Sequence, residues 1–546
     1  MSKKTILFWV IILVILILNS FHTTYPDEFD NILGGKLILQ GLLPYNSFFS
    51  HHGPLAYFLA AIINFFSGLS FVKFRLLSAV FFFILFLGSY RLVRKQIRSL
   101  SPNYFLLFIF ALAISMTFFW GQMFLADPVS GYLLVPAYAL LFLKIYFEER
   151  LENRDLWIIS IFSAFAVLNS MTYTYAAGTI GIIGIIWQIR KNGLTINNIL
   201  RFGVIFAAPY LIFAGYLLVT GSLADFLYQA VGYNQKYYIY NYPRAAGSTS
   251  FNPIRYAVVI LNNFINTYQP LLAGIARTDL RFPMTATMAI TNVFLWVYLA
   301  IRGRWLAILL SFGLMVFVNA RGNPGDLRAS DYQMAVYFTL SLFNATFMVF
   351  VLKEELVKIT NTFEKYLLVI GGVIFTFFWL HSSIFLTADF WRMNYSRYMG
   401  EMPLIYDRPA VAPILNSVLT KNDYCWVGPF EFEEMYYSKC KLPSKYHWIL
   451  PQFAGIDKIK TDIIADYSKN KPEIIVFRRN FSAFMQSAEY SRFFQNFLDE
   501  NYVRLPNGVH FTANKVKDFD LDADFNFRKD KAQELVNKLL DAKIIR

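Results

Sequence analysis

Three carboxylates stand close together near the beginning of the chain, in the segment 25–30: Asp27, Glu28 and Asp30. Carboxylates this close repel one another, which raises the pKa of at least one of them unless a cation or hydrogen bonds compensate. A carboxyl group with a raised pKa suits a general base, and a group of carboxylates suits a metal site. The alternative is a solvated loop entrance, where acidic residues are common.

A further carboxylate, Asp127, is the only charged residue between Arg98 and Lys144. It stands directly before Pro128, in what the hydrophobic pattern predicts to be a short turn at the membrane surface. A lone carboxylate there either caps the following helix, with Pro128 in its first turn, or belongs to a recessed site. The two roles are compatible, and we keep Asp127 as a candidate catalytic residue.

Cationic side chains that could hold a phosphate lie on the same predicted side. Arginine binds phosphate or carboxylate through two parallel hydrogen bonds. The loop 319–331 contains Arg321 and Arg328 and is the best candidate for a phosphate clamp, although pairing with aspartates of the same loop explains its composition equally well. His51 and His52 could bind metal or phosphate, but the sequence argues against zinc, because no cysteine or i, i+4 histidine is near.

The chain that must position these residues has the composition of a membrane protein. Of its 546 residues, 56% are hydrophobic and only 16% are charged, against about 25% charged residues in a soluble domain. This excludes a disordered chain, a disulfide scaffold and an ordinary cytosolic enzyme. The sequence contains neither the phosphate-binding loop of ATP-driven transporters nor the G-x-S-x-G nucleophile elbow.

Twelve hydrophobic stretches are candidate membrane segments: 5–19, 54–71, 76–90, 104–120, 129–143, 156–168, 173–189, 202–220, 284–301, 305–319, 332–351 and 366–387. The segment 91–98 carries four Lys and Arg residues, so the positive-inside rule places it in the cytoplasm. If Met1 is inside and all twelve stretches span, this segment falls outside. The stretch 54–71 begins at a proline, and we therefore interpret it as an interfacial or re-entrant helix. Eleven spans remain.

The net charge of +14 then becomes an orientation signal. In this arrangement the cytoplasmic loops hold 17 of the 50 Lys and Arg residues and 7 of the 36 Asp and Glu residues. Most of the basic excess therefore faces the cytoplasm. It gives no support to a nucleic-acid partner.

We therefore predict a mainly α fold, with a polytopic transmembrane bundle of about eleven spans in residues 1–388 and an extracytoplasmic soluble α/β domain in residues 389–546. Two outer loops, 20–75 and 221–283, belong to the bundle domain. The predicted tail strands are 423–427 and 473–477, and the predicted tail helices are 481–490, 492–501 and 530–542. Cys425 and Cys440, the two cysteines of the chain, either pair in this compartment or remain buried thiols.

The order of these parts carries a resemblance. In sequence order, its elements are the Asp27-Glu28 pair after the first span, Gly34, a Gly-Leu-Leu-Pro-Tyr segment (41–45), a His-Gly-Pro-Leu segment (52–55), Arg75 at the head of a span and an Ala-Asp-Pro segment (126–128). This order resembles the GT-C superfamily of membrane glycosyltransferases. It looks closest to the branch of the protein O-mannosyltransferases and the lipid A aminoarabinose transferases. The resemblance is clearest over residues 20–150.

The resemblance implies that a sugar is taken from a polyprenyl-phosphate carrier at the outer face and passed to an acceptor with inversion. Asp27, with Glu28 beside it, would deprotonate or orient the acceptor hydroxyl. Asp127 would be the second acid of the site, and Arg75 matches a site arginine of the mannosyltransferase branch. A lipid phosphate is a good leaving group, so the reaction needs little beyond a base, cations and a dry cavity.

The remaining expected substrate-binding residues are Asp30, Tyr45, His52, Arg321 and Arg328. His52 matches the histidine of a His-Pro-Pro-Leu segment in the family, but Gly53 replaces one proline here, which puts that role in doubt. A lysine that the family often carries between its fifth and sixth spans is absent from residues 168–172.

The expected function is that of an inverting glycosyltransferase whose partners are a polyprenyl-phosphate sugar donor, a glycan, lipid or protein acceptor, and the bilayer. The expected location is the cytoplasmic membrane of a prokaryote, with the active site and tail domain extracytoplasmic. No metal ligand is assigned and no cofactor is certain; a divalent metal stays open. The alternatives are a transporter or flippase of lipid-linked sugars, and a non-catalytic membrane-anchored binding protein.

Overall fold

The structure is a computed structural model of the whole chain. It describes, with a few further single residues and pairs, residues 3–22, 24–97, 102–238, 260–265, 282–318, 332–355, 409–449, 456–478, 492–506 and 523–546. The chain forms two compact units. The bundle unit is Met1–Thr23, Val72–Tyr216 and Asn252–Ile405, and the sheet unit is Thr24–Phe71, Leu217–Phe251 and Tyr406–Arg546. The predicted boundary at residue 388 lies outside the described residues.

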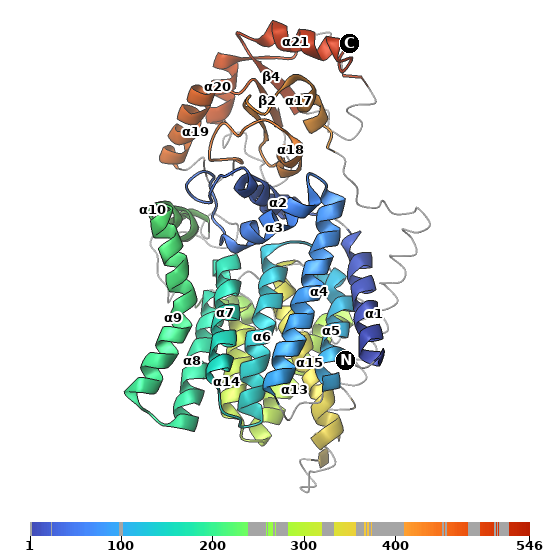
Figure 1. Cartoon of the computed structure of the whole chain (residues 1–546), viewed down its shortest axis with the longest axis vertical. Helices are drawn as coiled ribbons and strands as arrows, with labels where there is room; N and C mark the ends of the chain where they lie inside the picture. Colours follow the sequence, from blue (N-terminus) through green and yellow to red (C-terminus); the bar gives the residue numbers. More distant parts are fainter. Residues whose placement is uncertain are drawn as a thin grey trace. The chain divides into compact units, whose positions relative to one another are not determined.

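The bundle unit consists of apolar helices that run side by side (Figure 1). They are α1 (Lys3–Ser20), α4 (Phe71–Gln96), α5 (Pro102–Ser115), α6 (Ala126–Tyr146), α7 (Asn153–Asn169), α8 (Thr174–Asn192), α9 (Ile196–Val219), α13 (Phe282–Ile301), α14 (Trp305–Phe317) and α15 (Ala335–Glu355). The predicted spans thus appear as helices wherever the structure describes them. The last one, 366–387, lies almost wholly outside the described residues.

Among the described residues, five segments are long and apolar enough to cross a membrane: α1, α4, α6, α9 and Tyr332–Val351, which contains most of α15. These are the segments of an integral membrane protein. Over their described residues, the other helices of the bundle unit fall short of this length or of this hydropathy, so the number of eleven spans stays a prediction. Helix α6 is buried along its entire length, which makes it the centre of the bundle unit.

A network of neutral polar side chains joins α6, α13 and α15 inside the bundle. The Asn344 amide donates to Asn292 Oδ1 at 2.8 Å, and Asn344 Oδ1 accepts from the Tyr138 hydroxyl at 2.6 Å. The Asn292 amide donates to the hydroxyl of Ser341 at 2.9 Å. Amides and hydroxyls that bond across helices hold membrane bundles together, because a polar group left unpaired in hydrocarbon is costly.

Three of the loops that the charge pattern assigns to the cytoplasm meet at one end of the bundle. The carboxylate of Glu148 pairs with Lys191 at 3.6 Å and with Arg304. Glu148 and Arg304 follow α6 and α13, and Lys191 lies in the last turn of α8. Lys144, at the end of α6, pairs with Asp155 at 3.5 Å. The contacts agree with the prediction that these loops share one side.

The sheet unit contains a four-stranded sheet in the order β1-β2-β4-β3. Its strands are β1 (Cys425–Gly428), β2 (Ile474–Arg478), β3 (Tyr502–Arg504) and β4 (Ala523–Arg528). Strands β1 and β2 are parallel, and β4 pairs antiparallel with both β2 and β3. Helix α19 (Asp457–Asn470) lies in the connection between the parallel strands, as such a crossover requires.

The predicted tail elements are largely confirmed. Strands β1 and β2 overlap the two predicted strands, and helices α20 (Arg492–Asn501) and α21 (Ala532–Asp541) match two predicted helices. The predicted helix 481–490 lies outside the described residues. The other helices of the unit are α2 (Pro26–Leu39), α3 (Leu55–Ser67), α10 (Leu223–Phe226), the π-helix η3 (Leu227–Tyr238), α17 (Ala412–Val418) and α18 (Phe432–Tyr437).

Helices α2 and α3 pack closely because α2 carries two glycines. A Cβ atom on Gly34 would overlap the ring of Tyr57, and one on Gly35 would lie 2.6 Å from the backbone of Ala60. Helix α3 has 13 residues, a length of about 20 Å, which is short of the roughly 30 Å of hydrocarbon. The length is compatible with the predicted interfacial helix, which stays a prediction.

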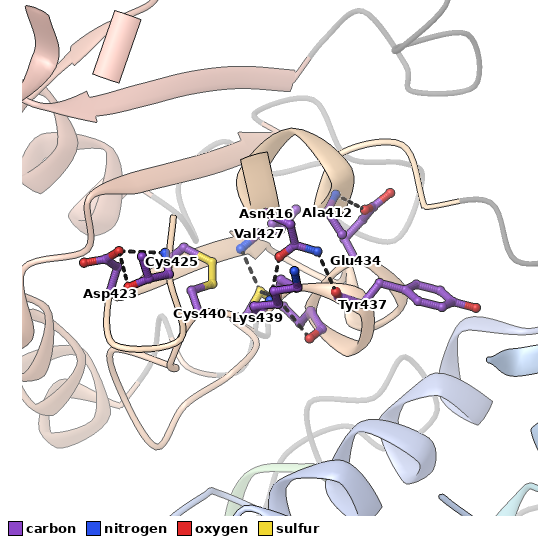
Figure 2. The surroundings of a disulfide bond; sticks show 12 residues. Ala412, Asn416, Asp423, Cys425, Val427, Glu434, Tyr437, Lys439 and Cys440 are labelled. Atoms are coloured by element: carbon purple, nitrogen blue, oxygen red, sulfur yellow. Dashed lines mark hydrogen bonds between the residues drawn. A yellow bond between two sulfur atoms is a disulfide. The ribbon is translucent and has the colours of Figure 1, made fainter. Parts of the chain in front are cut away.

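The two cysteines form a disulfide between Cys425 and Cys440, 15 residues apart (Figure 2). The structure thus decides the alternative that the sequence left open. Beside the bridge, the Glu434 carboxylate accepts backbone N–H bonds from the start of α17, among them Ala412 at 2.7 Å. A carboxylate at the N-terminus of a helix neutralises its unpaired N–H groups. Glu434 therefore links α18 to α17.

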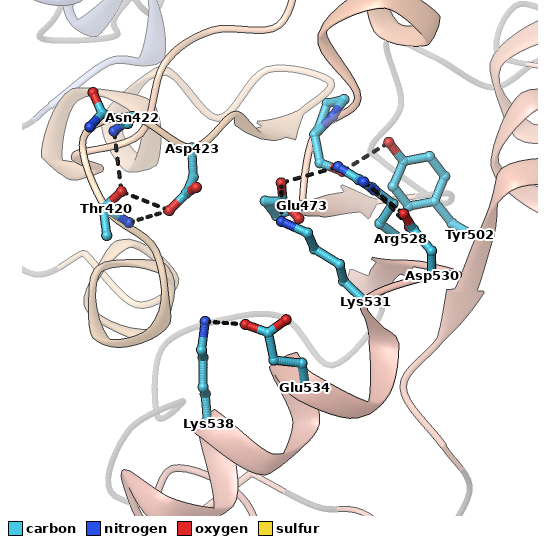
Figure 3. A network of polar contacts seen from close by, with 11 residues as sticks. Thr420, Asn422, Asp423, Glu473, Tyr502, Arg528, Asp530, Lys531, Glu534 and Lys538 are labelled. Carbon is cyan, nitrogen blue, oxygen red and sulfur yellow. Dashed lines mark hydrogen bonds and ion pairs between the residues drawn. The ribbon is translucent and has the colours of Figure 1, made fainter.

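A second polar cluster joins β4 to β2 at the surface, as Figure 3 shows. The Arg528 guanidinium pairs with Asp530 through two hydrogen bonds, at 2.6 and 2.7 Å, and with Glu473 at 3.2 Å. Lys531 also donates to Glu473, at 3.1 Å. The hydrogen bonds from Arg528 lower the pKa of the exposed Asp530 to about 2. These contacts join two separate segments of the unit, at Glu473 and at residues 528–531.

Candidate functional site

The candidate residues form two groups, one in each unit. In the bundle unit, Asp127 lies in the first turn of α6 and is fully buried. The N-cap position is occupied by Leu125, without a side-chain cap bond. The alternative that Asp127 is the N-cap of this helix is therefore wrong: the helix begins at Ala126, two residues earlier than that role needs. Its negative charge is still favoured there, because the N-terminal end of a helix carries a positive partial charge.

The Asp127 carboxylate accepts a hydrogen bond from the Tyr173 hydroxyl at 2.5 Å. The amide of Asn169 donates to the Ala126 carbonyl at 2.5 Å and to the hydroxyl of Ser130 at 2.8 Å. Asn169 and Tyr173 lie at the turn between α7 and α8, where residues 168–172 contain no lysine. Sequence reasoning recorded only that absence and missed both contacts.

Arg75 is fully buried and lies one turn into α4. Its neighbour Phe74 packs edge-on against Phe124, with 5.5 Å between ring centroids, just before α6 begins. The beginnings of α4 and α6 therefore lie at the same end of the bundle. This is the end opposite Lys144, because α6 runs from Asp127 to Lys144. Arg75 and Asp127 thus share one end of the unit.

In the sheet unit, the carboxylates of Asp27 and Glu28 lie in the first turn of α2, after Pro26 at its first position. The prediction of a solvated loop entrance is wrong for Glu28, which is fully buried, while Asp27 is partly exposed. Proline favours a helix start because its missing N–H has no helical partner at that position. The acids therefore stand where the helix dipole stabilises negative charge.

Asp30 contacts side chains from two distant segments of the sheet unit. Its Oδ1 lies 3.0 Å from His447 Nε2, and its Oδ2 accepts from the Tyr57 hydroxyl at 3.2 Å. Tyr57 in turn lies 2.9 Å from the Ser50 hydroxyl. Burial, followed by the charge of Asp30, raises the pKa of Tyr57. The pair Asp30–His447 joins positions 417 residues apart, which no short motif signals.

Lys36 is a buried cation that the sequence reasoning did not single out. Its ammonium donates to the backbone carbonyls of Met435 at 2.8 Å and Ser438 at 2.7 Å, at the end of α18. Burial lowers its pKa from 10.5 to about 7. A lysine with such a pKa is able to exchange a proton near neutral pH, and pKa shifts of this size cluster at functional sites. Capping of α18 explains the same contacts structurally.

The loop between α2 and α3 contains the two remaining described candidates. Tyr45 is fully buried at a φ of 70°, and its hydroxyl donates to the His52 carbonyl at 2.7 Å. Its own carbonyl accepts from the Gln229 amide at 2.7 Å. The rings of His51 and His52 lie 3.9 Å apart. These contacts give Tyr45 the geometry of a residue that shapes the loop around His52.

Arg321 and Arg328 lie outside the described residues, so the predicted phosphate clamp stays a prediction. Within the described ranges, no three His, Cys, Asp or Glu side chains come together as ligands for a metal ion. Asp30, whose oxygens face a histidine and a tyrosine, is held as a hydrogen-bond acceptor.

No protein-family model matches the chain, and no curated protein sequence matches it significantly. Among solved structures, the chain is similar to the archaeal oligosaccharyltransferase AglB from Archaeoglobus fulgidus, in complex with an inhibitory peptide and a dolichol-phosphate. The match covers 99% of this chain and 78% of that chain, at 12% identity and a TM-score of 0.40. A likeness of this size carries no argument about function.

Proposed function

We propose that the protein is an inverting glycosyltransferase that moves a sugar from a polyprenyl-phosphate donor to an acceptor hydroxyl at the outer face of the membrane. The observation that carries the proposal is the buried carboxylate of Asp127 at one end of an apolar bundle, at the same end as Arg75. Ionisable groups in such surroundings are costly and mark functional sites.

The chemistry assigns a role to each group. The carboxylate of Asp27, with Glu28 beside it, takes the proton of the acceptor hydroxyl, and the acceptor oxygen forms a bond to the anomeric carbon. The bond between that carbon and the phosphate oxygen breaks, and the polyprenyl phosphate leaves with the electron pair. Arg75 stabilises the negative charge of the leaving phosphate. Asp127, positioned by Tyr173, is the second acid of the site.

The location of the bundle supports a lipid-linked donor. The long apolar helices α4, α6 and α9 suit a bilayer, and a polyprenyl chain reaches a protein laterally through the same bilayer. A transferase needs its reacting groups at the membrane surface, where the carrier phosphate lies. Asp127 and Arg75 stand at helix starts, and the Lys144 cluster stands at the far end.

The test is transfer of radiolabelled sugar by the purified full chain in detergent, with polyprenyl-phosphate-linked hexoses and pentoses as donors and total lipid and glycan extract as acceptor. Asp127→Asn is expected to lower the rate by about 10²–10⁴-fold, the usual contribution of a positioned acid or base. The matched control is Asp155→Asn. Asp155 is also a buried aspartate; it lies in α7 and pairs with Lys144 at the opposite end of α6.

If the Asp127→Asn variant transfers sugar as fast as the Asp155→Asn variant, Asp127 has no role in the reaction. A wild-type chain that releases no sugar from any donor, but binds donor or acceptor, would favour the transporter or binding-protein alternative. In intact cells, deletion of the gene is expected to cause accumulation of one polyprenyl-phosphate sugar, which then identifies the donor.

A further inference from the structure

The sheet unit contains a cavity of about 470 Å³ that none of the candidate residues above lines. One wall is the loop that follows α2, with Asn46 and Ser47, and the other is formed by residues 442–445 and one face of α19. Its size falls in the range of small-molecule sites, about 300–1,000 Å³. Both walls belong to the sheet unit.

Two carboxylates of α19, Asp462 and Asp466, point to the same side because they are four residues apart. Each uses one oxygen within the protein: Asp462 Oδ2 accepts from the Tyr446 hydroxyl at 3.3 Å, and Asp466 Oδ2 accepts from the Ser444 hydroxyl at 2.7 Å. In the described part of the chain, the second oxygen of each carboxylate accepts no hydrogen bond. These bonds hold the carboxylates in place and leave one acceptor on each.

Donors and further acceptors face the same space. The Asn470 amide donates to the carbonyl of Pro443, which leaves its side-chain oxygen as an acceptor. Lys445 contributes a cation, whose nearest carboxylate within the described ranges is Asp225 at 3.8 Å. The side chains of Asn46 and Ser47 make no hydrogen bond to other described residues, and both line the cavity.

This lining favours one chemical class of ligand. A neutral polyhydroxylated ligand needs acceptors for its hydroxyl protons and donors for its hydroxyl oxygens at alternating positions. The carboxylates and the Asn470 oxygen supply the acceptors, and Asn46, Ser47 and Lys445 supply the donors. A basic peptide would meet the positive charge of Lys445, and an anion would meet the two carboxylates.

We propose that this cavity is a binding site for a short saccharide, and that it holds the acceptor of the transfer reaction. The acceptor role rests on the proposed function, whereas saccharide binding does not. The saccharide hydroxyls donate to the second oxygens of Asp462 and Asp466 and accept from Asn46 and Lys445.

The experiment is binding of the purified full chain, in detergent and without donor, to a microarray of defined oligosaccharides. Wild-type protein is expected to bind one structural class of saccharide. Asp462→Asn/Asp466→Asn is expected to weaken that binding at least about tenfold, because hydrogen bonds to charged groups are the stronger ones. The matched control is Asp457→Asn, on the same helix, whose side chain is 95% exposed and pairs with Lys460.

Binding should be insensitive to salt, since the ligand is neutral; a loss of binding at 0.5 M NaCl would indicate a charged ligand and overturn the proposal. Failure to bind any saccharide would also overturn it, as would equal binding by wild type and the double variant. An unchanged unfolding midpoint of the double variant excludes misfolding as the cause of lost binding.

The transfer assay separates this proposal from the proposed function. With the bound saccharide as acceptor, the double variant should raise the acceptor KM at least about tenfold while kcat stays within about twofold. Saccharide binding without any sugar transfer would support the saccharide site and contradict the proposed function. Transfer with an unchanged acceptor KM in the double variant would keep the function and remove the acceptor role of the cavity.

Discussion

The two units bury polar groups of different kinds. The network inside the bundle unit is neutral and consists of the amides of Asn292 and Asn344 with hydroxyl partners. The sheet unit buries ionisable groups, among them Lys36, Asp30 and His447. A membrane bundle lies in a medium where charge is costly, whereas buried ionisable groups outside the hydrocarbon need only local partners.

The exceptions in the bundle are informative for that reason. The described Asp, Glu, Lys and Arg side chains that are buried in the bundle unit stand near helix ends: Asp127 and Arg75 at one end, and Lys144 and Asp155 at the other. The second pair is held by a visible ion pair. The first pair contains the residues that the proposed chemistry needs. We therefore propose that the end with Asp127 and Arg75 is functional and that the end with Lys144 and Asp155 is structural.

The largest expected effect is the pH dependence that Lys36 gives to the sheet unit. Because burial lowers its pKa from 10.5 to about 7, the unfolded chain binds more protons than the folded one between these values. Stability therefore rises with pH from about 7 to 10.5, by at most about 5 kcal/mol; below pH 7 the destabilisation by the buried ammonium is present in full and adds no pH dependence. Lys36→Met should remove the slope.

The measurement for Lys36 is pulse proteolysis in urea from pH 7 to pH 10, with detection of a C-terminal tag so that the sheet unit is observed. Lys439→Met, which changes an exposed lysine of the same unit, is the matched control and should keep the wild-type slope. An equal slope in Lys36→Met and wild type would contradict the lowered pKa.

The next effect concerns the pair of Asp30 and His447. Asp30→Ala removes the carboxylate that contacts the buried His447 Nε2 and one of the two partners of the Tyr57 hydroxyl, and is expected to destabilise the sheet unit by about 3 kcal/mol. Hydrogen exchange of the β2 amides measures this loss. In a double-mutant cycle with His447→Ala, the two effects should be strongly non-additive; additive effects would show that the contact does not couple the two residues.

A smaller effect is expected in the bundle. Asn344→Leu removes the bonds to Asn292 and Tyr138 and should cost about 1 kcal/mol, because polar contacts between membrane helices are individually modest. The thermal unfolding midpoint in detergent is the readout. A loss as large as that of Asp30→Ala would mean that neutral networks matter as much as buried ionisable pairs in this protein.

The smallest effect belongs to the exposed network of Figure 3. The pKa of Asp530 is lowered to about 2 by hydrogen bonds from Arg528, so any stabilisation is present above the usual pKa of 3.8 and is lost as the pH falls through about 2. Asp530 is fully exposed to solvent, and Asp530→Asn should leave the urea midpoint at pH 7 unchanged. A clear decrease at pH 7 would show that an exposed pair can match a buried one.

Much of the fold was predictable because hydrophobic runs and strand patterns are local. The helices that contain Asp127 and Arg75 and the tail strands β1 and β2 appear where the pattern places them. The sequence predicts the first turn of α2 less well, because a cluster of acids after proline fits both a loop and a helix start. Burial of Glu28 depends on the side chains that cover it, which no local pattern contains.

The sequence by itself determined the apolar helices and their charged ends. These follow from the hydrophobic effect and the cost of charge in a bilayer, which act on each segment separately. Only the tertiary structure decided the disulfide, the partners of Asp30 and Asp127, the lowered pKa of Lys36 and the cavity beside α19. Each of these depends on residues far apart in the chain, whose approach is set by packing rather than by spacing along the sequence.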